Sequence, residues 1–233
     1  MIQEAFIFYK PCKLLQPYVR YYWVFSSNQM PNTYTFPIGC PQIIFHKRTP
    51  LYIPELGTTQ SKLTISGQVN FSSHLQADDD IEMIVVVFHP HTINMFLNAP
   101  AYSFYNQEIS GYDIEDEQLN KLAAHVFECE DNSLCVTLIE NWLLDRLSIR
   151  SYDTIYRVKR MNAAIEQLFT APQTMVADLS SALICSVYIF SQALKYSGYF
   201  FFALFFHKAK IGLRIVNPIF LKKEPSRILS ISL

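Results

Sequence analysis

The amino-acid sequence predicts an α+β protein: an N-terminal antiparallel sheet or small barrel with helices, followed by an all-α helix-turn-helix region. Three observations predict this fold class. Before Pro90, short runs of β-branched and aromatic residues alternate with Pro, Gly and Asn. After Pro90, apolar residues recur at intervals of three and four. Between Met175 and Lys195, two short helical patterns flank a tight turn.

The runs before Pro90 are expected to be strands because they are short and rich in Val, Ile, Tyr, Phe and Trp. The predicted strands are residues 21–25, 42–46, 62–66 and 83–88. No helix long enough for a crossover is indicated between them, which favours antiparallel pairing. We therefore expect Trp23, Ile44 and Val86 to be buried in a sheet core.

Amphipathic helices are expected only after Pro90, where the apolar period changes from two to about 3.6. The predicted helices are residues 92–98, 115–127, 133–147 and 154–169. Asp131 begins a stretch with N-cap chemistry for the third of them. The polar residues 148–153 form a joint, which divides the chain into domains 1–150 and 151–233.

Composition and charge separate these two parts. Hydrophobic residues make up 50% of the chain and charged residues 17%, so a sizeable core is expected. Residues 1–150 carry 9 Lys and Arg against 16 Asp and Glu, whereas residues 151–233 carry 10 against 4. A protein needs positive charge to bind a phosphate backbone, and the C-terminal part has it. The alternative explanation is that these charges only lie on solvent-exposed faces.

No enzyme class or cofactor is indicated. The chain contains no Gly-rich phosphate loop, GxSxG elbow or HExxH motif. His89 and His91 have the spacing of metal ligands in some barrels, but Pro90 turns the chain between them and no carboxylate lies at ligand spacing. No metal site is therefore expected, and the acidic runs 78–80 and 115–117 are expected to be solvated.

A cytoplasmic location is expected. The segment Met1–Phe6 has neither the basic nor the apolar region of a signal peptide. The five cysteines form no CxxC pair, which fits free thiols in a reducing compartment. The apolar run Tyr199–Phe206 is far shorter than the about 20 residues that a membrane span needs, so no membrane partner is expected.

Several segments together resemble the AraC/XylS family of bacterial transcription regulators. They are Pro17–Trp23, Pro37–Phe45, Ser66–Gln68, Ile84–Pro90, Leu138–Leu147 and Val176–Leu183, followed by Ser186, Phe190, Leu194 and Lys195 at the family's spacing. The resemblance covers roughly residues 5–198. It implies a sheet-containing N-terminal domain that senses an unidentified small-molecule effector or forms a homodimer, and a C-terminal helix-turn-helix domain that binds DNA.

The recognition helix departs from the family pattern. Family members usually place an arginine two residues after the serine that opens this helix, where this chain has Tyr188. The residues expected to face DNA are Tyr188, Ser191, Gln192 and Lys195. Only one of them is a cation, so weak binding is expected. Beyond Gly198 the family's second helix-turn-helix does not fit, which indicates a truncated, weakened or frame-shifted DNA-binding part.

Two functions of different classes follow. The first is a DNA-binding transcription regulator of the AraC type. The second is a ligand-binding or dimerisation module that no longer binds DNA. In both, the predicted ligand site is the mouth of the N-terminal barrel, lined by Tyr22, Trp23, Phe45 and His46.

Overall fold

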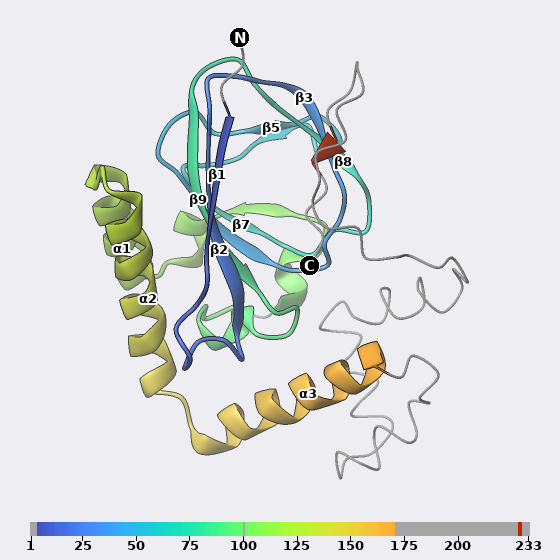
Figure 1. Cartoon of the computed structure of the whole chain (residues 1–233), viewed down its shortest axis with the longest axis vertical. Helices are drawn as coiled ribbons and strands as arrows, with labels where there is room; N and C mark the ends of the chain where they lie inside the picture. The colour runs from blue at the N-terminus through green and yellow to red at the C-terminus, as the bar shows by residue number, and fades with distance from the viewer. Residues whose placement is uncertain (1–3, 100, 171–227, 230–233) are drawn as a thin grey trace.

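The protein has the predicted α+β fold (Figure 1), in a computed structural model that describes residues 4–99, 101–170 and 228–229. Two sheets, one of six strands and one of five, form its centre. The strands are β1 (Glu4–Tyr9), β2 (Val19–Ser27), β3 (Met30–Thr35), β4 (Gln42–His46), β5 (Tyr52–Ile53), β6 (Thr58–Thr59), β7 (Leu63–Ser66), β8 (Ser73–Ala77), β9 (Ile81–Phe88), β10 (Glu108–Ser110) and β11 (Ile228–Leu229).

The six-stranded sheet has the order β1-β2-β9-β4-β7-β10, and all its pairs are antiparallel. The five-stranded sheet has the order β11-β3-β8-β5-β6 and is antiparallel except for the β11–β3 pair. The described strands do not close into a barrel, so the sheet alternative of the prediction is confirmed and the barrel alternative is not. The ligand site was expected at the mouth of a barrel. The structure has no such mouth among the described strands and instead has a space between two sheets.

The longer predicted strands lie where their composition placed them. Residues 42–46 coincide with β4, and the other three runs fall largely within β2, β7 and β9. Trp23, Ile44 and Val86 are buried, as expected. Both faces of β9 are apolar because this central strand is covered on both sides.

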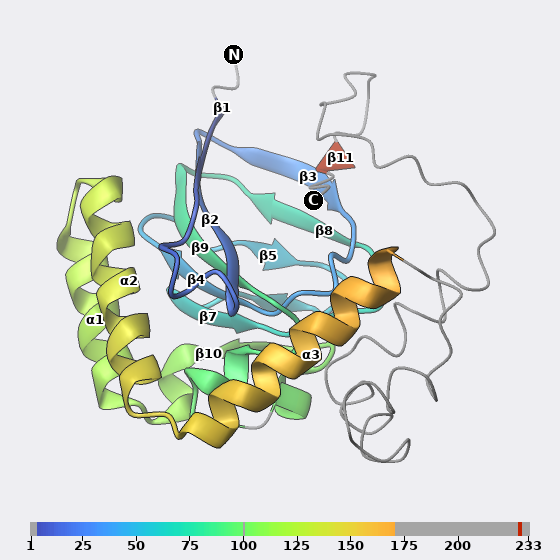
Figure 2. The same ribbon diagram turned by 60° about the horizontal axis from the view of Figure 1, so that its bottom comes forward.

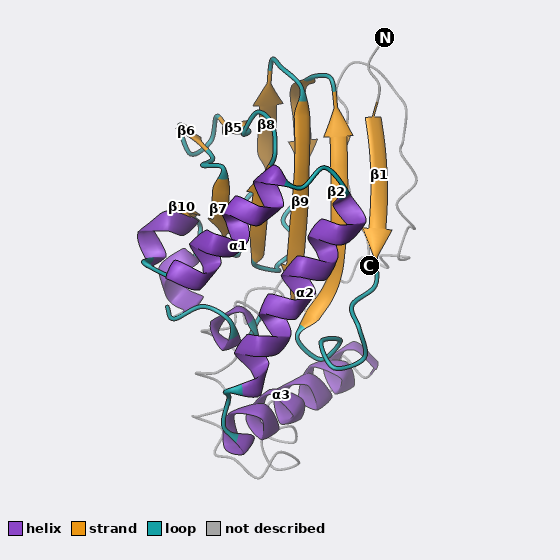
Figure 3. Ribbon diagram, turned by 90° about the vertical axis from the view of Figure 1, so that its left-hand side faces the viewer, coloured by secondary structure: helices purple, strands orange, loops and turns teal. Residues whose placement is uncertain are grey.

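Two helices cover one face of the six-stranded sheet (Figure 3). They are α1 (Glu117–Glu128) and α2 (Asn132–Ser148), close to their predicted bounds. Asp116 caps α1 by accepting a hydrogen bond from the Leu119 amide, and Asp131 caps α2 by accepting from the Ser133 and Leu134 amides. The predicted cap at Asp131 is thus confirmed.

Helix α3 (Tyr152–Thr170) runs beneath the strands, at an angle to α2 (Figure 2). The side chain of Asn162 donates to the Pro17 carbonyl at 2.7 Å, and Val158 is buried in the same core as α1 and α2. The joint predicted at residues 148–153 lies between α2 and α3, although α3 packs against the preceding part rather than standing apart from it. The division into domains 1–150 and 151–233 stays a prediction.

One predicted helix is wrong. Residues 92–98 form only a short 3-10 helix, η1 (Ile93–Met95). Thr92 at its start makes no side-chain cap, and its hydroxyl donates to the Tyr18 carbonyl. Two more 3-10 helices follow, η2 (Ala101–Phe104) and η3 (Gly111–Ile114). The predicted helix-turn-helix at 175–195 lies outside the described residues. Within the part of the chain that the structure describes, no helix combines the length and apolar character needed to cross a membrane.

Candidate functional site: a cavity between the two sheets

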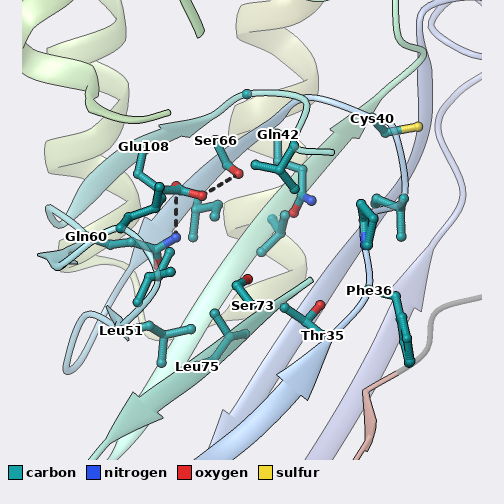
Figure 4. A pocket seen from close by; sticks show the side chains of 18 of the residues that line it. Thr35, Phe36, Cys40, Gln42, Leu51, Gln60, Ser66, Ser73, Leu75 and Glu108 are labelled. Atoms are coloured by element: carbon teal, nitrogen blue, oxygen red, sulfur yellow. Dashed lines mark hydrogen bonds between the residues drawn. The ribbon is translucent and has the colours of Figure 1, made fainter. Parts of the chain in front are cut away.

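The face of the six-stranded sheet that α1 and α2 do not cover looks onto a cavity (Figure 4). The second sheet forms the opposite wall, with Thr35 of β3 and Ser73 and Leu75 of β8. The cavity encloses about 100 Å³, which is room for about three water molecules or an organic molecule of a few heavy atoms. This volume is well below the range of roughly 300–1,000 Å³ typical of drug-sized ligands.

A row of polar side chains crosses the six-stranded sheet at one end of this cavity. Gln42 of β4 pairs with Ser66 of β7, and Ser66 pairs with Glu108 of β10. Residues that pair directly across strands project from the same face, so all three side chains line the cavity. The row continues into apolar residues, because Gln42 pairs on its other side with Val87.

Hydrogen bonds hold the Glu108 carboxyl in place (Figure 4). The Ser66 hydroxyl donates to Glu108 Oε1 at 2.8 Å, and the Gln60 amide Nε2 donates to Oε2 at 3.0 Å. The other end of the Gln60 amide, Oε1, lies 2.8 Å from His46 Nε2. Because Gln60 uses its nitrogen on the carboxylate, its oxygen must accept, so His46 carries its proton on Nε2. The chain of donors runs from His46 through Gln60 to Glu108.

Burial shifts the pKa of both ionisable groups in this hydrogen-bonded series, Glu108 and His46. It raises the pKa of Glu108 to about 7, against which the hydrogen bonds from Ser66 and Gln60 act in the opposite direction. It lowers the pKa of His46 to about 4, so the imidazole is neutral at pH 7. Glu108 is the only carboxylate among the described residues that line the cavity, and none of those residues is Lys, Arg or His.

Two glycines fix the strands that carry Ser66 and Glu108. A Cβ on Gly67, directly after Ser66, would lie 1.4 Å from the Phe104 carbonyl oxygen. A Cβ on Gly111, directly after β10, would lie 2.4 Å from Leu63 Cγ. The backbone at Gly67 therefore packs against the Phe104 backbone, and the backbone at Gly111 packs against the Leu63 side chain. Only glycine, which has no Cβ, leaves room for these contacts.

The predicted ligand residues are divided between two faces of the sheet. Trp23 lines the cavity, and His46 lies behind it and reaches it through Gln60. Tyr22 and Phe45 lie on the opposite face, in the core beneath the helices. Successive side chains of a strand alternate between faces, so neighbours such as Tyr22 and Trp23 cannot line one site.

Sequence reasoning missed Gln60, Ser66 and Glu108. The one local signal was the alternation of Gln42, Ile44 and His46, which places two polar side chains on one face of β4. Glu108 had no signal of its own, because β10 is short and its position beside Ser66 depends on pairing between distant parts of the chain.

The remaining predicted sites are the DNA-facing residues and the histidines considered as metal ligands. Tyr188, Ser191, Gln192 and Lys195, the predicted DNA-facing residues, lie outside the described residues. The His89 Nε2 lies 3.1 Å from the Gln16 carbonyl oxygen. Residues 4–99, 101–170 and 228–229 contain no group of three or more His, Cys, Asp or Glu side chains that could hold a metal ion, and the expected lack of a metal stays a prediction.

Residues 7–110 match a domain of unknown function, DUF6597. The match begins within β1 and ends with β10, so it includes every residue named above as lining the cavity and stops before α1. No curated protein and no solved structure matches the chain.

Proposed function

We propose that this protein is a cytoplasmic transcription regulator of the AraC type, in which the two-sheet part binds a small-molecule effector and the basic C-terminal part binds DNA. The observation that supports effector binding is the cavity with Glu108 at its wall. A carboxylate accepts about four hydrogen bonds, and Ser66 and Gln60 supply two. A largely buried polar group with unused capacity is costly unless a partner completes it, which is how ligand sites are built.

The DNA-binding half of the proposal rests on the sequence. Residues 151–233 carry 10 Lys and Arg against 4 Asp and Glu, and their helix-turn-helix pattern resembles that of the AraC family. Effector binding in the first part and DNA binding in the second are then two properties of one chain, coupled through α2 and α3. A homodimer formed through the N-terminal part belongs to the same proposal.

The two tryptophans provide the test of effector binding. Trp23 lines the cavity, whereas Trp142 of α2 is buried on the other side of the six-stranded sheet. In the variant Trp142→Phe, all tryptophan fluorescence comes from Trp23. We expect a library of small metabolites to contain a compound that shifts or quenches this fluorescence in a saturable way.

The matched control is Trp23→Phe, which leaves only Trp142. The same compound should leave this second emission unchanged, because Trp142 does not touch the cavity. A compound that changes both emissions equally acts elsewhere on the protein. The proposal that the cavity is an effector site fails if no compound changes Trp23 alone.

DNA binding is tested with the full chain and a pool of random duplexes at increasing salt. A regulator should bind with an affinity that falls steeply as salt rises. Replacing Tyr188 with Arg restores the family's usual residue, and we expect it to raise affinity for the selected duplex by about 1–3 kcal/mol if it reaches a guanine edge. The exposed substitution Tyr152→Arg on α3 adds the same charge and serves as the control.

The second candidate is a ligand-binding module that no longer binds DNA. The replacement of the usual arginine by Tyr188 favours it. Saturable binding at the cavity together with no salt-dependent DNA binding, even at low salt, would establish this candidate and exclude the first.

A further inference from the structure

We propose that the cavity takes a small organic cation, a primary ammonium carried on a short alkyl chain, with the ammonium group against the Glu108 carboxylate. This proposal rests on the proposed function, in that it assumes the cavity is a ligand site, and it adds the chemical class of the ligand.

The charge of the cavity favours a cation. Among the described residues that line the cavity, Glu108 has the only formal charge, and no ion pair involving it occurs among the described residues. An isolated carboxylate in a largely apolar space is unfavourable, which is why burial raises its pKa to about 7. A cationic ligand removes this penalty, whereas an anionic ligand adds repulsion to it.

The free hydrogen-bond acceptors of Glu108 favour a ligand that donates. Each Glu108 oxygen already accepts one hydrogen bond, from Ser66 or from Gln60, and each retains a free acceptor position. A primary ammonium offers three N–H donors and no acceptor, which matches the free acceptor positions of the Glu108 carboxylate. Gln42, next to Ser66 in the same polar row, supplies an amide oxygen for a further donor.

The size and the walls of the cavity favour a small ligand with an alkyl chain. The cavity volume of about 100 Å³ accommodates only a few heavy atoms. Its other walls are mainly apolar, with Trp23, Ile44 and Val85 from the six-stranded sheet and Leu75 from the second sheet. Thr35 and Ser73 add two hydroxyl groups on the second sheet. The apolar residues suit a short alkyl chain, and the volume fits a ligand of a few heavy atoms better than a bulky aromatic amine.

The test compares three probes of nearly equal size that differ in head group: n-propylammonium, n-propanol and propionate. Binding to the full-length protein is measured by calorimetry at pH 8, where Glu108 is mostly ionised. We expect saturable binding of propylammonium, at least about tenfold weaker binding of propanol, and no binding of propionate.

Two variants assign the effect to the carboxylate. Glu108→Gln keeps the shape and an acceptor for Ser66, removes the charge, and replaces the oxygen that accepts from Gln60 by an amide nitrogen. It should lower propylammonium affinity by at least about tenfold while propanol binding is unchanged. Glu128→Gln, at the exposed end of α1, removes the same charge away from the cavity and should change nothing.

A measurement on the unmodified protein covers the case in which Glu108→Gln does not fold. Propylammonium affinity should be several-fold lower at pH 5.5 than at pH 8, because Glu108 is protonated at the lower pH. Cys40 also lines the cavity, and His46 lies next to Gln60 behind it. Both groups are neutral at both pH values, since burial lowers the pKa of His46 to about 4 and raises that of Cys40. Propanol affinity should not change.

The outcomes separate this inference from the proposed function. If propanol or propionate binds as tightly as propylammonium, or if Glu108→Gln leaves propylammonium binding intact, the cation inference is wrong and the effector cavity stands. If none of the three probes binds, the inference is wrong, and the Trp23 fluorescence screen decides the cavity separately. If propylammonium binds through Glu108 without altering DNA affinity, the cation inference is right. The proposal that ligand binding at the cavity regulates DNA binding is then wrong for this ligand.

Discussion

The two faces of the six-stranded sheet differ in what covers them and in what their side chains do. On the helix-covered face, Tyr22, Ile43 and Phe45 join residues of α1 and α2 in one continuous apolar core. On the other face, Trp23, Ile44 and Val85 form a second apolar cluster that borders the cavity, and the polar row Gln42–Ser66–Glu108 lies at its end. The same strands build both faces.

This difference shows how one strand can serve stability and binding together. In β4, Ile43 and Phe45 point to the helices, whereas Gln42, Ile44 and His46 point to the second sheet. Alternate residues of a strand project to opposite faces. The cavity face can therefore carry a carboxylate whose burial lowers stability, while the helix face adds stability through close packing. Substitutions on the two faces should therefore have different effects on stability and on ligand binding.

The largest difference is expected between two adjacent isoleucines. Ile43→Ala on the helix face should cost about 4 kcal/mol of unfolding free energy, because it leaves a dry void in a close-packed core. Ile44→Ala on the cavity face should cost about 2 kcal/mol, because the space beside it is already open. Urea unfolding of both variants measures the difference. Equal costs, or a larger cost for Ile44, would contradict the distinction between the faces.

The next effect concerns how the helices are attached. The Arg146 guanidinium of α2 contacts Asp116 Oδ1 and Oδ2 at 2.5 and 2.7 Å, and Asp116 also caps α1. Both side chains are nearly buried, so Asp116→Ala should cost about 3 kcal/mol by leaving Arg146 without its partner. Thermal unfolding measures it, and Asp113→Ala, at an exposed aspartate three residues earlier, is the control.

The variant Asp116→Ala also tests whether the helix layer and the cavity are independent of each other. If the faces are separate, Asp116→Ala should leave the response of Trp23 to a cavity ligand unchanged at temperatures where the protein is folded. A lost response in a folded variant would show that the helix layer shapes the cavity.

The smallest effect is a pH dependence that belongs to the cavity face. The pKa of Glu108 is about 7 in the folded protein, against an ordinary value of 4.5. The folded state therefore holds this proton more tightly, and the associated stability is complete below pH 4.5 and is lost as pH rises to about 7. Relative to Glu108→Gln, the unmodified protein should lose about 2 kcal/mol across this window, which is below the full shift because the carboxyl is partly exposed.

The comparison with Glu108→Gln is needed because His46 acts in the opposite direction. Its pKa of about 4 lies below its ordinary value of 6.5, so its contribution to stability increases as pH rises between these values. Urea unfolding of both proteins at pH 4.5, 5.5 and 7 isolates the Glu108 contribution. A difference that does not change with pH would mean that the Glu108 pKa is not raised.

The sequence was sufficient for the parts of the fold that depend on local patterns. Strand β4 and the helices α1 and α2 were predicted within a few residues, because their apolar periods and the Asp131 cap are local features. The short polar strands were missed. Strand β8 reads Ser-His-Leu-Gln-Ala and lacks the β-branched residues that mark a strand, and its pairing with β3 defines it instead.

The candidate site was less predictable than the fold, for the same reason. Its central group, Glu108, faces Ser66 and Gln60 only because β10 pairs with β7 across 42 positions. Its chemistry arises from burial, which no local pattern around Glu108 reports. The assignment of Tyr22 and Phe45 to a ligand site failed because aromatic character alone does not say which face of a sheet a side chain occupies.

The two glycines beside the polar row also determine which substitutions the site tolerates. In a saturation mutagenesis experiment scored by ligand response, the uncharged residues that line the cavity should accept their closest chemical substitutes, as in Gln42→Asn. Gly67 and Gly111 should accept none, not even alanine, because a single added carbon meets Phe104 or Leu63. The least mutable positions around this cavity are therefore expected to be two residues that offer a ligand no functional group at all.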